Sequence, residues 1–174
     1  MNCLRPLLAV ALGSIWLVSP CFAEPLTVES IGSTAERLLA KSKFVELEQM
    51  VSGYIEDDTH LVGGNSAIYH FYGALGCYAG APRWDYSSPM SRAAKLGLLE
   101  GWLAKRPSSS TARIALAQFW STEAWAARGG EYADHVPDRV WTSFHESLMR
   151  LVDCAVAAKL PGVAICVVPE ATAE

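Results

Sequence analysis

Cysteine is scarce and is not arranged for metal binding or redox chemistry. The 174-residue chain has five cysteines and no Cys-x-x-Cys pair, which excludes the usual zinc and thioredoxin-type sites. Only Cys77, Cys154 and Cys166 lie beyond residue 23. An odd number excludes a framework of paired disulfides, so a single bridge or buried thiols remain as alternatives.

Signatures of catalysis and of cofactor binding are also missing. No two histidines stand three or four residues apart, as a metal-binding helix face requires. Gly63-Gly64 is not followed by the Lys-Ser or Lys-Thr of a phosphate loop, and no serine occupies a Gly-x-Ser-x-Gly elbow. Asp57-Asp58 lacks the alternating ligands of a calcium loop. We therefore predict no catalytic residue, no metal and no cofactor, and an enzyme remains only as a site assembled in space.

Basic residues are fewer than acidic ones, 14 against 18, so the formal net charge is −4. Nucleic-acid binding needs clusters of Lys and Arg, so the composition argues against that function. The charge is uneven: residues 24–58 hold eight acids and three bases, whereas residues 83–113 hold six bases and two acids. Two solvated helix faces, or two segments that pack near each other, would explain this pattern.

A long hydrophobic run is absent except at the N-terminus. Residues 7–18 are apolar or small, Arg5 precedes them, and Cys21-Phe22-Ala23 offers small residues for a cut before Glu24. This pattern predicts a signal peptide over residues 1–23 and a periplasmic or secreted protein with no membrane span after cleavage. A membrane anchor would need about 20 apolar residues. A lipoprotein acylated at Cys21 is a further alternative, which Pro20 disfavours.

Strand-like alternation is absent, and a helical period fills the rest of the chain. Apolar residues recur at three- and four-residue steps in six segments, which predicts helices over residues 31–39, 44–55, 66–78, 91–106, 111–128 and 137–159. The short turns between them predict an all-α domain at 24–160, built of stacked antiparallel hairpins in the manner of tetratricopeptide repeats. Residues 161–174 form a tail with a short apolar run at 163–168.

Three motifs together resemble a known family. Trp102 opens a Trp-x4-Pro-x-Ser turn, Trp125 and Arg128 belong to an Ala-Trp-x-x-Arg-Gly stretch, and Trp141 begins a Trp-x-x-Phe pattern. The combination, over residues 44–158, resembles a bacterial family of secreted domains of unknown function with tetratricopeptide-like hairpins. The resemblance implies the fold and the compartment but no activity. Members of that family continue into a further helical region, so the tail stands either for a truncated domain end or for a replacement of it.

Aromatic residues supply the candidate core. Trp102, Trp125, Trp141 and Phe144 lie on the apolar stripes of three predicted helices. Large aromatic side chains on such a stripe are typical of a helix–helix interface. We predict that these four side chains are buried.

The candidate partner-binding residues lie mainly in the loop at residues 80–89. Arg83, Trp84 and Tyr86 are of the types that dominate binding hot spots, and Arg92 with Lys95 would add a basic rim. The alternative is that Trp84 folds back as a plug over the helices.

Arg128, at a helix end, is a further candidate. It is either a clamp for a carboxylate or a cation that serves the helix dipole.

The sequence thus favours a module that binds a protein or peptide in the cell envelope. An immunity, inhibitor or chaperone-like protein and an enzyme of unknown class are the alternatives. A binding module should expose an aromatic patch rimmed by charge, whereas an enzyme should converge ionisable groups with perturbed pKa values in a deep pocket.

Overall fold

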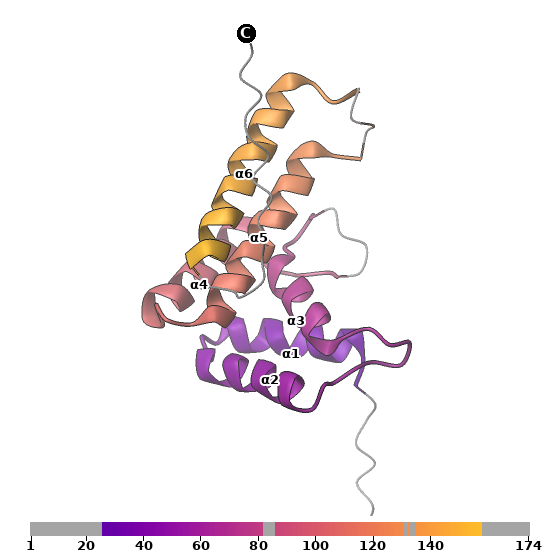
Figure 1. Ribbon diagram of the computed structural model, residues 1–174, viewed down its shortest axis with the longest axis vertical. Coiled ribbons are helices and arrows are strands. Elements are labelled where there is room, and N and C mark those ends of the chain that lie inside the picture. The colour runs from indigo at the N-terminus through magenta and orange to yellow at the C-terminus, as the bar shows by residue number, and fades with distance from the viewer. Residues whose placement is uncertain (1–25, 82–85, 131, 133–134, 158–174) are drawn as a thin grey trace, which may run out of the picture.

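The computed structural model describes residues 26–81, 86–130, 132 and 135–157, and its regular elements are all helices. In chain order they are α1 (Val28–Ala40), α2 (Phe44–Glu56), α3 (Ala67–Gly76), α4 (Arg92–Lys105), α5 (Ser110–Arg128) and α6 (Asp138–Ala157) (Figure 1). The all-α prediction is therefore confirmed. The predicted signal peptide (residues 1–23) and tail (residues 161–174) lie outside the described residues.

Local hydrogen bonds fix several helix ends. Thr27 and Ser30 form a reciprocal capping box at the start of α1, with distances of 3.0 and 2.9 Å, so the helix begins three residues before the predicted segment. Ser109 accepts a hydrogen bond from the Ala112 amide at the start of α5. Gly129 ends α5 with a φ of 74°, in the left-handed region that glycine tolerates, so this helix ends where the predicted segment 111–128 does.

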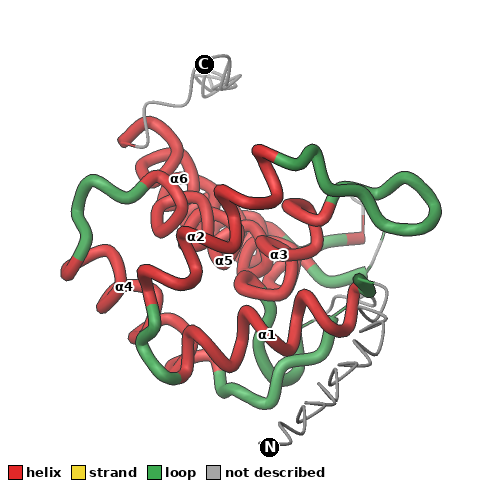
Figure 2. The backbone as a smooth tube through the Cα atoms, turned by 90° about the horizontal axis from the view of Figure 1, so that it is seen from below, coloured by secondary structure: helices red, strands yellow, loops and turns green. Residues whose placement is uncertain are grey.

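The helices pack in a way that is consistent with a stack of hairpins. The α1 and α2 helices lie side by side, α3 packs on both α1 and α5, and α4 packs on α5 (Figures 1 and 2). The most extensive contact is between α5 and α6, whose upper halves in Figure 1 rise beyond the other helices. A closer correspondence to tetratricopeptide repeats stays a prediction.

One hydrophobic core lies among α1 to α5. Trp102 is fully buried there and its ring stacks on Phe44, with centroids 5.6 Å apart and planes inclined by 4°. Seventeen buried residues form this core: Ile31, Ala35, Leu39, Phe44, Leu47, Val51, Ala67, Phe71, Leu75, Tyr78, Leu99, Trp102, Ala112, Ala115, Leu116, Phe119 and Trp120. None of them belongs to α6, which joins the body mainly through α5.

Ion pairs join the acidic N-terminal segment to the later basic one. Arg106, directly after α4, holds Glu48 on α2 through two N–H groups, at 2.8 and 2.6 Å. Burial alone would raise the pKa of Glu48, but hydrogen bonds from Arg106 and Ser109 outweigh it and lower that pKa. A second pair joins Glu36 on α1 to Lys95 on α4. The uneven charge of the sequence therefore reflects, in part, segments that pack against each other.

Candidate binding surfaces

The loop residues predicted to meet a partner are only partly described. Arg83 and Trp84 lie outside the described residues. Tyr86 is only 9% exposed, and its hydroxyl lies 2.8 Å from Nδ1 of the buried His70. The ring fills the space over Gly73, where a Cβ atom would come within 2.5 Å of Tyr86 Cζ. Tyr86 is therefore buried, because this glycine leaves room for the ring inside the fold, and its role in partner binding stays a prediction.

The predicted basic rim is wrong at Lys95, whose side chain is buried within the fold. Arg92 is exposed but pairs with Glu123 on α5. Lys95 is fully buried and pairs with Glu36. Lys95 is therefore not available to an acidic partner, whereas about half of the Arg92 side chain stays exposed. The sequence placed Lys95 on a helix but held no local sign of its partner, which lies 59 residues earlier.

Glu36, Lys95 and Ser88 form a buried polar cluster. Lys95 donates to a Glu36 carboxylate oxygen and lies 3.4 Å from the Ala74 carbonyl, while Ser88 donates to the other Glu36 oxygen at 3.1 Å. Burial lowers the pKa of Lys95, and the neighbouring Glu36 charge opposes that shift. Because the ammonium group is fully buried and already bonded, we read the cluster as a structural link among α1, α3, α4 and the 86–90 segment rather than a catalytic site.

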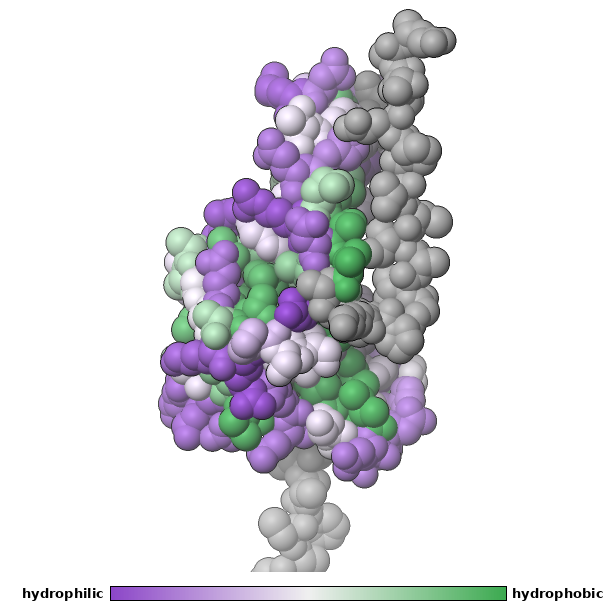
Figure 3. Space-filling model, turned by 60° about the vertical axis from the view of Figure 1, so that its left-hand side comes forward, coloured by the Kyte–Doolittle hydropathy of each residue, from purple (hydrophilic) through white to green (hydrophobic). Residues whose placement is uncertain are grey.

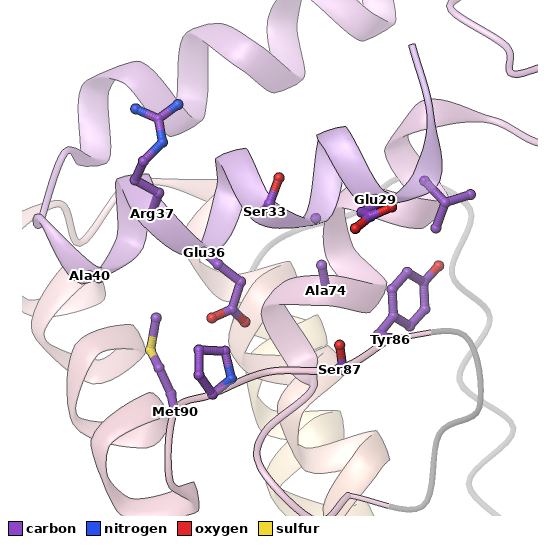
Figure 4. A pocket seen from close by; sticks show the side chains of 12 residues that line it. Glu29, Ser33, Glu36, Arg37, Ala40, Ala74, Tyr86, Ser87 and Met90 are labelled. Carbon is purple, nitrogen blue, oxygen red and sulfur yellow. The ribbon is translucent and has the colours of Figure 1, made fainter. Parts of the chain in front are cut away.

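A groove lies next to the Glu36–Lys95–Ser88 cluster, between α1, α3 and the 86–90 segment, and Glu36 is one of its lining residues (Figure 4). Its volume is about 760 Å³ and its lining is mostly apolar. Figure 4 shows Tyr86 and Met90 along one side, the Glu36 carboxylate directed into the space, and the Arg37 guanidinium directed away from it. Within the fold, the charge of Glu36 is matched by Lys95.

An aromatic surface lies near the free end of the α5–α6 hairpin. Trp125 is 51% exposed, and its ring meets Phe144 edge to face at a centroid distance of 5.8 Å. Trp141 and Phe144 are half-buried and 5.6 Å apart. The prediction of a core position is wrong for Trp125, and Trp141 and Phe144 lie outside the main core. The physical reason is that this end of α5 extends beyond α3 and α4, and among the described helices it lies beside α6 (Figure 1).

Arg128 lies across two of these rings. Its guanidinium carbon is 5.3 Å from the Trp125 ring centre and 5.8 Å from that of Trp141. Such stacking orients a guanidinium through cation–π attraction and leaves its N–H edge available for a carboxylate. Among the described residues no carboxylate forms an ion pair with Arg128. We name Trp125, Arg128, Trp141 and Phe144 the aromatic surface.

The remaining length of α6 also leaves apolar area exposed. None of its described side chains is buried, and Met149 and Val156 are 57% and 62% exposed. Figure 3 shows hydrophobic residues at the surface of one face of the molecule, between hydrophilic ones. Exposed apolar area that is grouped in this way marks a contact surface more often than scattered single residues do.

Neither a metal site nor a membrane span is found in the part of the chain that the structure describes. No group of three or more His, Cys, Asp or Glu side chains there could hold a metal ion. No described helix is long and apolar enough to cross a bilayer. Cys77 and Cys154, the described cysteines, are not joined by a disulfide.

Comparison with known proteins places the chain in one family. Residues 34–173 match the family described as Domain of unknown function (DUF4034), and the chain belongs to it. No curated protein and no solved structure matches the chain. The membership agrees with the resemblance to a family of unknown function that the tryptophan motifs indicated.

Proposed function

We propose that this protein is a binding module of the cell envelope that recognises another protein or a peptide through the aromatic surface. The observation that carries the proposal is Arg128, which is half-buried, stacks on two indole rings and has no carboxylate partner among the described residues. Trp and Arg dominate binding hot spots, because they combine large contact area with a rigid set of donors. The surface fits a partner that presents a carboxylate beside an apolar side chain.

The position of the surface supports the same function. It lies on two long helices, so its side chains are held more firmly than they would be on a loop. The hairpin end that carries it projects from the body of the fold (Figure 1). The buried cluster of Glu36, Lys95 and Ser88, by contrast, has no exposed ammonium group for catalysis.

The envelope location rests on the sequence pattern at residues 1–23. We propose cleavage before Glu24 and release into the periplasm or the medium. Intact-mass measurement of the exported protein tests this proposal. A mass that retains residues 7–18 would overturn it, and a lipid adduct on Cys21 would establish the lipoprotein instead.

Affinity capture from the native envelope extract tests the binding surface. We expect the double variant Trp125→Ala, Arg128→Ala to lose the captured partner while its thermal melting stays close to that of the unaltered protein. The matched control is Val62→Ala with Lys41→Ala, two exposed positions away from the hairpin. The control should retain the partner. Equal capture by both double variants would refute the assignment of the aromatic surface.

Replacing Arg128 by lysine separates charge from geometry. A lysine keeps the positive charge but loses the planar fork that stacks on indole rings and grips a carboxylate. We expect Arg128→Lys to bind the captured partner more weakly than the unaltered protein does. Binding that is unchanged would show that charge alone, rather than the stacked guanidinium, serves recognition.

A further inference from the structure

The groove between α1, α3 and the 86–90 segment has the size and lining of a small-molecule site. Its volume of about 760 Å³ lies within the range of about 300–1,000 Å³ that is usual for ligand pockets. Opposite α1, the side chains of Tyr86, Pro89 and Met90 supply apolar surface, and Ala74 on α3 adds to it (Figure 4). Such a lining suits an alkyl chain, because it removes apolar surface of the ligand from water.

The charge that faces the groove is negative. Glu29 and Glu36 both line it from α1, and they stand seven residues apart, which places them two helical turns apart on one side of the helix. Arg37, the cation among the described lining residues, directs its guanidinium away from the space (Figure 4). Lys95 pairs with Glu36 from within the fold and does not line the groove.

The two carboxylates contribute differently. Glu36 is 8% exposed, and its carboxylate, which is directed into the groove, already accepts hydrogen bonds from Lys95 and Ser88. A carboxylate has about four lone-pair sites, so these two bonds leave it further acceptor capacity. Glu29 is exposed, and no cation among the described residues forms an ion pair with it. Glu29 is therefore the uncompensated charge of the groove.

This combination favours a cation over the other classes of ligand. An anion would meet two carboxylates and no cation directed into the groove, and like charges repel. A neutral apolar molecule would remove water from acceptors without giving them a donor, which is unfavourable. An ammonium group on an apolar chain matches both features, because it donates to the carboxylates while its chain covers the apolar wall.

We propose that this groove binds an aliphatic amine, whose ammonium group meets the carboxylates of Glu29 and Glu36 and whose alkyl chain lies against Pro89 and Met90. None of these residues belongs to the aromatic surface, which lies on α5 and α6. The proposal is therefore independent of the proposed function.

Titration of the exported protein with hexylamine, followed by amide NMR spectra, tests the site. At neutral pH this amine is protonated. We expect hexylamine to shift the amide signals of α1 and of the 86–90 segment. Hexanoate, which carries the opposite charge on a chain of similar length, should not shift them, and the neutral hexanol should bind more weakly. Binding of hexanoate or hexanol as tight as that of hexylamine would overturn the proposal, and so would shifts confined to the signals of the aromatic surface.

Replacing Glu29 by glutamine removes the uncompensated charge and nearly preserves the shape of the side chain. We expect Glu29→Gln to weaken hexylamine binding roughly fivefold, as the loss of one exposed ion pair would. The matched control is Glu46→Gln, because Glu46 is also an acidic residue in the first turn of a helix but does not line the groove. The control should bind hexylamine as the unaltered protein does.

A second variant places a cation in the groove itself. Ser33 is exposed and lines the groove, so Ser33→Lys should abolish hexylamine binding by repulsion, whereas the same change at the exposed Ser52 on α2 should leave it unchanged. Circular dichroism shows whether each variant is folded, and Glu29→Gln decides alone if Ser33→Lys is not. Unchanged hexylamine binding in the folded groove variants would overturn the proposal.

Discussion

Replacing Lys95 by methionine probes the buried cluster most directly. Methionine keeps most of the length and apolar volume of lysine but removes the ammonium group. The Glu36 carboxylate, in a side chain only 11% exposed, would keep the Ser88 hydroxyl at 3.1 Å and lose its cation. Breaking one side of a buried ion pair costs about 3–5 kcal/mol. The free energy of unfolding of a typical domain is about 5–15 kcal/mol. We therefore expect Lys95→Met to lose a third or more of the stability.

Urea unfolding followed by circular dichroism measures this loss. The control is Lys105→Met on the same helix, an exposed lysine whose ammonium lies 5.4 Å from the Phe44 ring centre. Loss of that cation–π contact should cost less than about 1 kcal/mol. Adding Glu36→Gln to Lys95→Met should recover much of the lost stability, because no charge is then buried. The reasoning is refuted if the two lysine variants are equally stable, or if Glu36→Gln makes the Lys95→Met protein less stable still.

Three further predictions concern the core and its pH dependence. Trp102→Ala should cost about 3–5 kcal/mol in the free energy of unfolding, because the residue is fully buried. Trp125→Ala should cost much less, because this residue is 51% exposed. Equal melting temperatures of the two variants would contradict this contrast. Gly76→Ala should destabilise the protein by about 1–3 kcal/mol, since the added Cβ would lie 2.9 Å from backbone atoms of Gln118. An unchanged free energy of unfolding in urea would show that α3 and α5 can separate at little cost. Burial raises the pKa of Tyr72 from 10.0 to about 12, so the unfolded chain releases this proton first and the stability should fall as the pH rises from 10 to 12. Burial also raises the pKa of Tyr54 and of Tyr78, so ultraviolet titration of the folded protein should show several late tyrosine ionisations, of which Tyr72→Phe removes one. An unchanged titration curve in that variant would count against the shift.

Much of the local structure could be predicted from the sequence, because its causes are local. Each helix shows its apolar residues at a helical period, and Gly129 ends α5 through a backbone conformation that is favourable for glycine. Trp102, which the sequence placed on an apolar stripe, is fully buried in the core that residues of α1, α2, α3 and α5 complete. The periplasmic or secreted location stays a prediction from the sequence, because residues 1–23 lie outside the described residues.

The candidate sites depended on contacts between distant segments. Periodicity shows which side chains share a helix face, but it does not show whether another helix covers that face. Trp125 therefore lies on an apolar stripe and is still half exposed, because α5 extends beyond α3 and α4. Lys95, by contrast, is a charged residue that is buried. Its carboxylate partner lies 59 residues earlier, and the packing of α4 against α1 brings the two charges together. The sequence determined the helices and their stripes, and the tertiary structure decided which stripes and charges face water.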